Sequence, residues 1–159
     1  MKFVCSLIVV SDIAISRVFY EDLLGQKVKY DFGENITFHG DFALHLKSHY
    51  SELIDHKEIR LEGNDFELYF ESNDLDILVD KLRANNVMFV HELRKQPWQQ
   101  LVVRFYDPDN HIVEVGESLD HLVFRLFQEG NTVKQIAELT QLSVEFINAS
   151  IQCVRKLDY

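Results

Sequence analysis

The chain has 159 residues, of which 47% are apolar and 26% are charged, and its net charge is −10. These proportions are typical of a folded domain with its own core, and they exclude a wholly disordered, collagen-like or coiled-coil chain. The negative charge argues against binding to nucleic acid or to anionic membranes, because both repel an acidic surface. With two cysteines, Cys5 and Cys153, and no apolar run long enough for a membrane span, we expect a cytoplasmic protein without a disulfide framework.

The first 47 residues predict a strand, a helix and three further strands. Residues 3–10 form a short apolar run rich in β-branched side chains, which is typical of a buried strand. Ser11 or Asp12 then caps a helix that Gly25 ends. Three short strand candidates follow at residues 27–31, 35–39 and 42–47.

The next stretch predicts the same elements again. Residues 48–63 are polar without a clear period, so we interpret them as a connector. A strand at residues 65–71 precedes a helix capped by Asn73 or Asp74. Strands are predicted at residues 87–91, 101–106 and 111–115, with a loop at 92–99 and a tight turn at 107–110. The sequence therefore predicts two repeats of the same order, a strand, a helix and three strands.

Residues 117–159 have a different character. They predict three amphipathic helices, with Thr132 and Gln135 spaced as a capping box for the second. The segment resembles a helix-turn-helix, but the helix in the recognition position carries Glu145 and no cation over residues 144–153, so we do not expect DNA binding. We expect this extension to pack on the rest of the chain or to join two subunits.

Two motifs give the doubled unit a family resemblance. One is Phe19-Tyr20 followed by Leu24-Gly25 in the first helix, and the other is the run Asp107-Pro108-Asp109-Asn110 ahead of Glu114. In this register the chain resembles the vicinal oxygen chelate superfamily, which includes glyoxalase I, bleomycin resistance proteins and extradiol dioxygenases. The resemblance implies an α+β fold in which two paired βαβββ units form a curved, mixed-sheet cleft. It places this domain at residues 1–116, with units 1–47 and 64–116, and leaves 117–159 as a helical extension.

The resemblance also implies a set of metal ligands. The superfamily's inward-facing positions correspond here to Cys5, His45, Glu67 and Glu114. The implied cofactor is a divalent metal, namely Zn, Ni, Mn or Fe, and no nucleotide cofactor is expected.

The residue types themselves allow two readings of these positions. If the two units pair, Glu67 and Glu114 face one hollow, where their repulsion requires a metal ion, a shared proton or a cationic substrate. His45 on the polar side of its strand completes a plausible ligand set. The alternative is a polar groove without metal, in which Cys5 is a small buried apolar residue.

Three further side chains are candidates for substrate binding. Tyr69 lies two residues from Glu67 on the same strand face, and Trp98 follows Pro97 in a loop, where it equally suits the core or a dimer interface. Arg104 suits a substrate carboxylate or phosphate, or else pairs with an acid across the sheet.

Three functions follow from these alternatives. The first is a metal-dependent enzyme, a lyase, isomerase or dioxygenase, in which Glu67 or Glu114 acts as general base on a small oxygen-chelating substrate. The second is a metal-free protein that binds a small molecule, as bleomycin resistance proteins do. The third is a regulator that uses the extension for contacts. The expected partners are a small molecule and a second copy in a homodimer, without nucleic acid or membrane.

Overall fold

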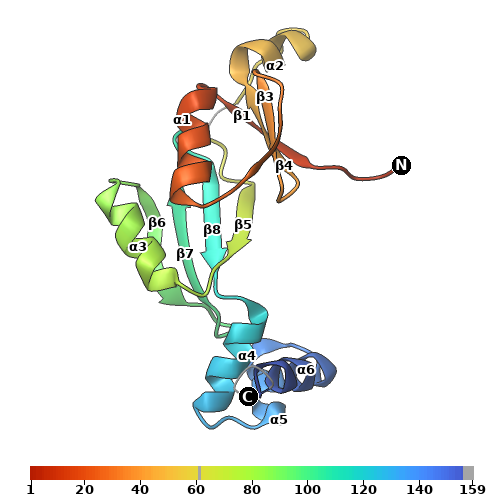
Figure 1. Ribbon diagram of the computed structural model, residues 1–159, viewed down its shortest axis with the longest axis vertical. Coiled ribbons are helices and arrows are strands. Elements are labelled where there is room, and N and C mark those ends of the chain that lie inside the picture. Colours follow the sequence, from red (N-terminus) through yellow and green to blue (C-terminus); the bar gives the residue numbers. More distant parts are fainter. Residues whose placement is uncertain (61, 156–159) are drawn as a thin grey trace. The chain divides into compact units, whose positions relative to one another are not determined.

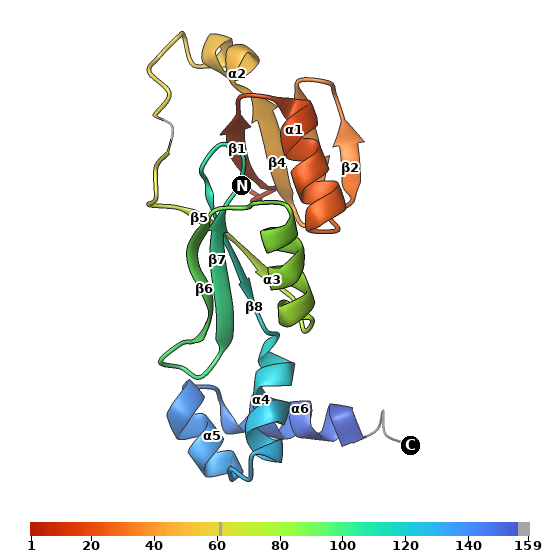
Figure 2. The same cartoon turned by 90° about the vertical axis from the view of Figure 1, so that its left-hand side faces the viewer.

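The computed structural model describes residues 1–60 and 62–155. Residue 61 of the predicted connector and residues 156–159 of the predicted extension lie outside this part. The chain divides into two compact units. The first unit holds Met1–Glu67 and Tyr106–Ile112, and the second holds Leu68–Phe105 and the chain from Val113 on. Figures 1 and 2 show the elements from two sides.

The first unit contains a four-stranded mixed sheet. Its elements in chain order are β1 (Ser6–Val10), α1 (Ile13–Val18), a π-helical turn η1 (Phe19–Leu23), β2 (Val28–Asp31), β3 (Asn35–Phe38), β4 (Phe42–Leu46) and α2 (Lys47–Leu53). The strand order is β1-β4-β3-β2, with β1 parallel to β4 and the other neighbours antiparallel. Asp12 begins α1 by accepting hydrogen bonds from the amides of Ala14 and Ile15, as the capping pattern predicts.

The core of the first unit lies between its sheet and the helical segment α1–η1. Phe38 and Phe42 stack with ring centroids 4.7 Å apart, and Tyr20 packs against Phe42 at 5.3 Å. Ile8 and Val10, which alternate with half-buried or exposed neighbours along β1, are buried. The alternation of side chains along this strand therefore places Ile8 and Val10 on its buried face.

The second unit repeats the topology. Its elements are β5 (Glu67–Glu71), α3 (Leu75–Ala84), β6 (Phe89–Lys95), β7 (Leu101–Tyr106) and β8 (Ile112–Gly116), in the strand order β5-β8-β7-β6. Each position in this order matches its counterpart in the first sheet. The strand-end residues Glu67, Tyr106 and Ile112 cluster with the first unit. The prediction of an α+β fold built from two βαβββ units is confirmed by these two mixed sheets.

The extension is helical and belongs to the second compact unit. Its helices are α4 (Leu119–Gln128), α5 (Val133–Thr140) and α6 (Val144–Arg155). They share a small apolar core of buried side chains: Leu122, Val123, Leu126, Ile136, Ile147 and Ile151. Thr132 and Gln135 form the predicted capping box, and Gln141 ends α5 in the left-handed conformation with φ of 63°. No helix in the described part of the chain is long and apolar enough to cross a membrane.

The structure departs from the predicted elements in three places. The β1 strand starts at Ser6 instead of residue 3, because its partner β4 begins opposite Ser6 at Phe42. Helix α2 stands where an aperiodic connector was expected, and its seven residues are too few for a helical period to repeat. The β6 strand continues to Lys95, through charged residues that suit an edge strand.

A buried hydrogen-bond network joins the two sequence motifs within the first unit. The Tyr20 hydroxyl donates to Asp107 Oδ2 at 2.9 Å, and His111 Nδ1 lies 2.9 Å from the same oxygen. Asp107 Oδ1 accepts from the amides of Asp109 and His111 and so holds the turn closed. Burial and the charge of Asp107 raise the pKa of Tyr20 well above 10.0. Burial lowers the pKa of His111, but its bond to Asp107 and that residue's charge outweigh burial and raise it above 6.5.

Removing the Tyr20 hydroxyl should destabilise the first unit. We expect Tyr20→Phe to lower the free energy of unfolding by about 2 kcal/mol, because a buried hydrogen bond to a charged acceptor contributes about 1.5–3 kcal/mol. Urea denaturation measures this change. Tyr30→Phe, at a half-exposed tyrosine, is the control and should leave stability unchanged. Equal stability of the two variants would contradict the role assigned to the network.

Candidate functional site

One face of the second sheet gathers three of the predicted site residues, together with Gly116. On β8, Glu114 and Gly116 are two positions apart and point to the same side, and Arg104 on the neighbouring strand β7 contacts Glu114. Tyr69 on β5 lies against Gly116, since a Cβ added there would be 3.3 Å from the Tyr69 ring. We call this face, defined by Tyr69, Arg104, Glu114 and Gly116, the second-sheet face.

Arg104 and Glu114 form a buried ion pair at the centre of this face. Glu114 is 5% exposed, and one of its carboxylate oxygens contacts Arg104 Nη2. Arg104 Nη1 also lies 3.3 Å from His91 Nε2, and His91 Nδ1 lies 2.9 Å from the Glu92 carbonyl oxygen. Because a guanidinium only donates, His91 Nε2 is the acceptor in this contact. Of the two alternatives for Arg104, the structure shows a contact with an acid across the sheet, and that acid, Glu114, is buried.

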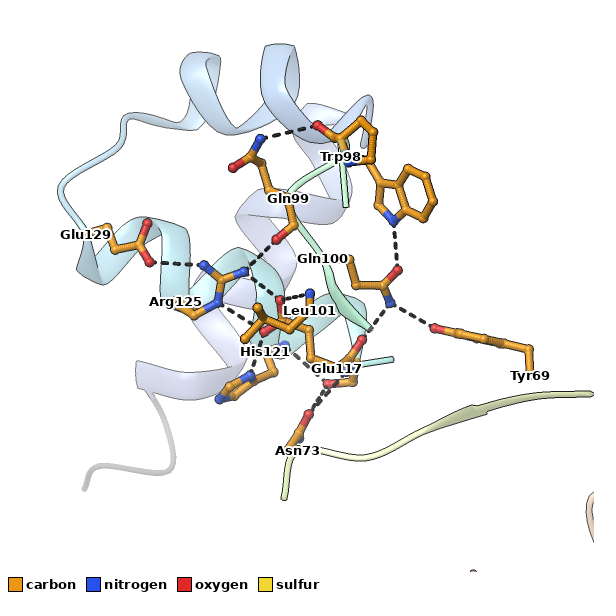
Figure 3. Close-up of polar contacts among 12 residues, drawn as sticks. Tyr69, Asn73, Trp98, Gln99, Gln100, Leu101, Glu117, His121, Arg125 and Glu129 are labelled. Carbon is orange, nitrogen blue, oxygen red and sulfur yellow. Dashed lines mark hydrogen bonds and ion pairs between the residues drawn. The ribbon is translucent and has the colours of Figure 1, made fainter. Parts of the chain in front are cut away.

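A single amide connects the two aromatic candidates. Gln100 Nε2 donates to the Tyr69 hydroxyl at 2.9 Å, and Gln100 Oε1 accepts from Trp98 Nε1 at 2.8 Å (Figure 3). A Cβ at position 116 would come within 2.8 Å of Gln100 Nε2, so only glycine admits this arrangement. Tyr69 also donates to Glu71 at 3.0 Å. Burial raises the pKa of Tyr69, the bond from Gln100 lowers it and Glu71 raises it, and the net direction is upward.

Glu117, at the start of the helical extension, holds the Gln100 side chain in place. Gln100 Nε2 donates to the Glu117 carbonyl at 2.7 Å, and the buried Glu117 carboxylate binds Arg125, the Leu101 amide and His121 (Figure 3). Burial alone raises the pKa of Glu117, but the hydrogen bonds from Arg125, Leu101 and His121 outweigh it and lower the pKa below 4.5. The first helix of the extension thus fixes the end of β8 and the start of β7.

His45 lies in the first unit and has a different neighbourhood. It is 6% exposed; Asn35 Nδ2 donates to its Nδ1 at 3.2 Å, and its Nε2 lies 2.9 Å from His49 Nδ1. Glu34 Oε2 lies 3.5 Å from the same His49 nitrogen. Burial, and next the charge of His49, lower the pKa of His45 below 6.5. Sequence reasoning missed His49, since its relation to His45 depends on a helix that follows β4 directly.

The remaining ligand candidates are Cys5 and Glu67. Cys5 is half-buried and precedes β1 in the first unit. Glu67 is the exposed first residue of β5, two positions before Tyr69. The structure thus brings Glu114, Arg104, Tyr69 and Trp98 to one face of the second unit, while Cys5 and His45 belong to the first.

These donors do not fit a metal centre as they lie here. The Glu114 carboxylate is matched by a guanidinium, and both ring nitrogens of His45 have partners. Across residues 1–60 and 62–155, no three His, Cys, Asp or Glu side chains gather in a way that could hold a metal ion. The ligand set of Cys5, His45, Glu67 and Glu114 therefore stays a prediction.

Comparison with known proteins decides the family. Residues 3–120 match the family described as glyoxalase-like domain. The chain belongs to the glyoxalase-like domain family. The match ends within α4, so most of the extension lies beyond it. No curated protein matches the sequence.

Several solved structures are similar to this glyoxalase-like chain. A protein of unknown function from Agrobacterium tumefaciens is 40% identical with a TM-score of 0.68, covering 75% of this chain and 95% of its own. A lactoylglutathione lyase from the same organism is 20% identical, with a TM-score of 0.57 and coverage of 74% and 93%. A fosfomycin resistance protein from Mesorhizobium loti is 19% identical, with a TM-score of 0.55 and coverage of 77% and 94%. The last two show a shared fold alone.

The Glu117 network predicts a specific pH dependence of stability. Since the folded pKa of Glu117 is below 4.5, the carboxylate contributes stability above that pH, and this contribution is lost as pH falls through the folded value. Glu117→Gln leaves Arg125 without its buried partner and should cost about 3 kcal/mol at neutral pH.

Urea denaturation at neutral pH and at several pH values below 4.5 tests this prediction. The stability difference between the native chain and Glu117→Gln should shrink with acidity. The matched control is Glu138→Gln on α5, whose side chain is 65% exposed. A constant difference across the pH range would overturn the assignment.

Proposed function

We propose that this chain is a metal-independent small-molecule-binding protein whose ligand is a planar cation held on the second-sheet face. The observation that carries the proposal is the ion pair between Arg104 and Glu114. It neutralises the arginine that a substrate anion would otherwise use, and it engages the glutamate that a metal would need.

What remains accessible beside this pair is aromatic and acidic. Tyr69 is 47% exposed and Trp98 is 39% exposed, and both are held in place by Gln100. Glu67 and Glu71 are exposed on the same side of β5 as Tyr69. Aromatic faces attract cations, and nearby carboxylates strengthen that attraction. A flat ligand with a positive charge therefore suits this face.

The rigidity of the face also supports binding. Gln100 fixes both aromatic rings with hydrogen bonds, and Glu117 fixes Gln100 through its carbonyl oxygen. Side chains held in this way lose less conformational freedom when a ligand binds. The extension then has a role in the proposed function, because its first helix holds Glu117 through Arg125 and His121.

The single tryptophan, Trp98, reports on this site directly. We expect N-methylphenanthridinium, a planar cation, to quench its fluorescence with a saturable curve. Uncharged phenanthridine, which has the same rings, should bind more weakly. Tyr69→Leu keeps the bulk but removes the aromatic face, and we expect it to weaken binding of the cation by about 10-fold.

Charge supplies the control for this titration. Glu71→Gln should weaken binding of the cation by about 3-fold, because exposed charges contribute less than about 1 kcal/mol. Glu138→Gln removes the same charge from the extension and should leave the binding curve unchanged. Equal affinity for the cation and the uncharged compound, or an effect of Glu138→Gln as large as that of Glu71→Gln, would sink the proposal.

A metal-dependent enzyme is the second candidate, and one observation favours it. His45 and His49 lie side by side with Glu34 close by, and imidazole and carboxylate are common ligands of Zn, Ni, Mn and Fe. In this structure His45 Nε2 and His49 Nδ1 hydrogen-bond to each other at 2.9 Å, so a metal would have to displace that bond. Such an enzyme would act on a small oxygen-chelating molecule, as a lyase or dioxygenase does. In this function, Glu67 and Glu114 keep the roles predicted from the sequence.

Elemental analysis separates the two candidates. For the metal-independent protein we expect no stoichiometric Zn, Ni, Mn or Fe in untagged protein, either as purified or after loading and desalting. Glu67→Gln and Glu114→Gln should not change that result. Stoichiometric metal in the native chain that is lost in His45→Gln would establish the metal-dependent candidate and reject the metal-independent one.

A further inference from the structure

A hollow of about 560 Å³ lies in the first compact unit, away from the residues assigned so far. Its volume is within the range of about 300–1,000 Å³ that is usual for small-molecule sites. Six residues line it: Ser11, Lys47, Ser48, Ser51, Lys57 and Ile59. Three segments contribute them, namely the residue after β1, helix α2 and the connector that follows α2.

The two sides of α2 face different neighbours. His49 and Tyr50 approach His45, with ring centroids 5.0 and 5.5 Å from it. Lys47, Ser48 and Ser51 line the hollow instead. Since successive residues of a helix turn by about 100°, positions 47, 48 and 51 share one side and positions 49 and 50 the other. The hollow is therefore separate from the His45 neighbourhood.

The charge of this hollow is opposite to that of the chain. The whole chain carries a net charge of −10, yet the lining residues include two lysines and no acid. In the described part of the chain, neither Lys47 nor Lys57 forms an ion pair. Asp109 Oδ1 accepts a hydrogen bond from the main-chain amide of Ser11, and Asp109 Oδ2 lies 3.4 Å from the hydroxyl of Ser16. Two lysines of an acidic protein thus converge without an internal counter-charge.

We propose that this hollow binds the phosphate group of a small phosphorylated molecule. Lysine ammonium groups act as point charges toward phosphate, and three serine hydroxyls add donors from several directions. Donors spread in this way suit a tetrahedral anion with several acceptor oxygens, whereas a planar carboxylate is better matched by the fork of an arginine. Ser51 also lies 3.4 Å from His56 Nδ1, which orients its hydroxyl at the wall.

Isothermal titration calorimetry of the full chain tests this inference. The probes are inorganic phosphate and phenyl phosphate, with sodium chloride of equal ionic strength as the blank. We expect saturable binding with one site per chain, and tighter binding of phenyl phosphate if the ligand is an ester. Lys47→Gln combined with Lys57→Gln should weaken binding at least about 10-fold, because hydrogen bonds to charged groups contribute about 1.5–3 kcal/mol each.

A charge-matched variant guards against a general electrostatic effect. Lys95→Gln combined with Lys134→Gln removes two positive charges outside the hollow and should leave binding unchanged. Ser51→Ala removes a donor without changing the charge and should weaken binding by a smaller factor. Circular dichroism confirms that each variant is folded. The inference would be overturned if neither phosphate probe bound saturably, or if the two double variants lost the same amount of binding affinity.

This test is independent of the proposed function. The calorimetric probes are anions and the variants lie in the first unit, whereas the fluorescence titration uses a cation and variants in the second. Loss of phosphate binding with retained quenching by N-methylphenanthridinium would reject the hollow alone. The reverse result would reject the cation site alone.

Discussion

The buried ion pair between Arg104 and Glu114 constrains the second sheet and what its open face can bind. A carboxylate that is 5% exposed requires a partner, because an isolated buried charge is strongly destabilising. In this chain the partner comes from the adjacent strand β7. Because β7 and β8 are neighbours in the sheet, the charge of Glu114 is neutralised within the unit. In the proposed function, the aromatic and acidic groups that remain recognise the ligand.

The helical extension is part of the same construction. Glu117 follows β8 directly, and its carboxylate holds Arg125 on α4 and the Leu101 amide at the start of β7. Through its carbonyl oxygen it also holds Gln100, whose amide positions Tyr69 and Trp98. Hydrogen bonds among these six residues thus connect α4, which lies mostly beyond the family match, to the second-sheet face. In the proposed function, the extension acts through this connection without contacting the ligand.

Proteins that share this fold have different functions. Solved structures with this fold include a lactoylglutathione lyase and a fosfomycin resistance protein, at about a fifth sequence identity. The fold supplies two sheets of equal topology, and the side chains on them decide the function. In this chain those side chains form an ion pair on the second-sheet face, a histidine pair beside β4 and a lysine-lined hollow beside α2. Each of these groups has its own chemistry.

The sequence by itself determined the doubled topology. Apolar periods of two and 3.6 residues, the capping residue Asp12 and the turn at Asp107 are local signals, so the strands and longer helices could be read from neighbouring residues. The short helix α2 and the start of β1 could not, because one is too brief for a period and the other is set by its partner strand. For the site, the sequence identified Tyr69, Trp98, Arg104 and Glu114 as candidates. Only the tertiary structure paired Arg104 with Glu114, placed Gln100 between the two aromatic rings and brought Lys47 and Lys57 to one hollow. These contacts join residues on different elements, and their formation depends on strand register and helix placement, which no local pattern encodes.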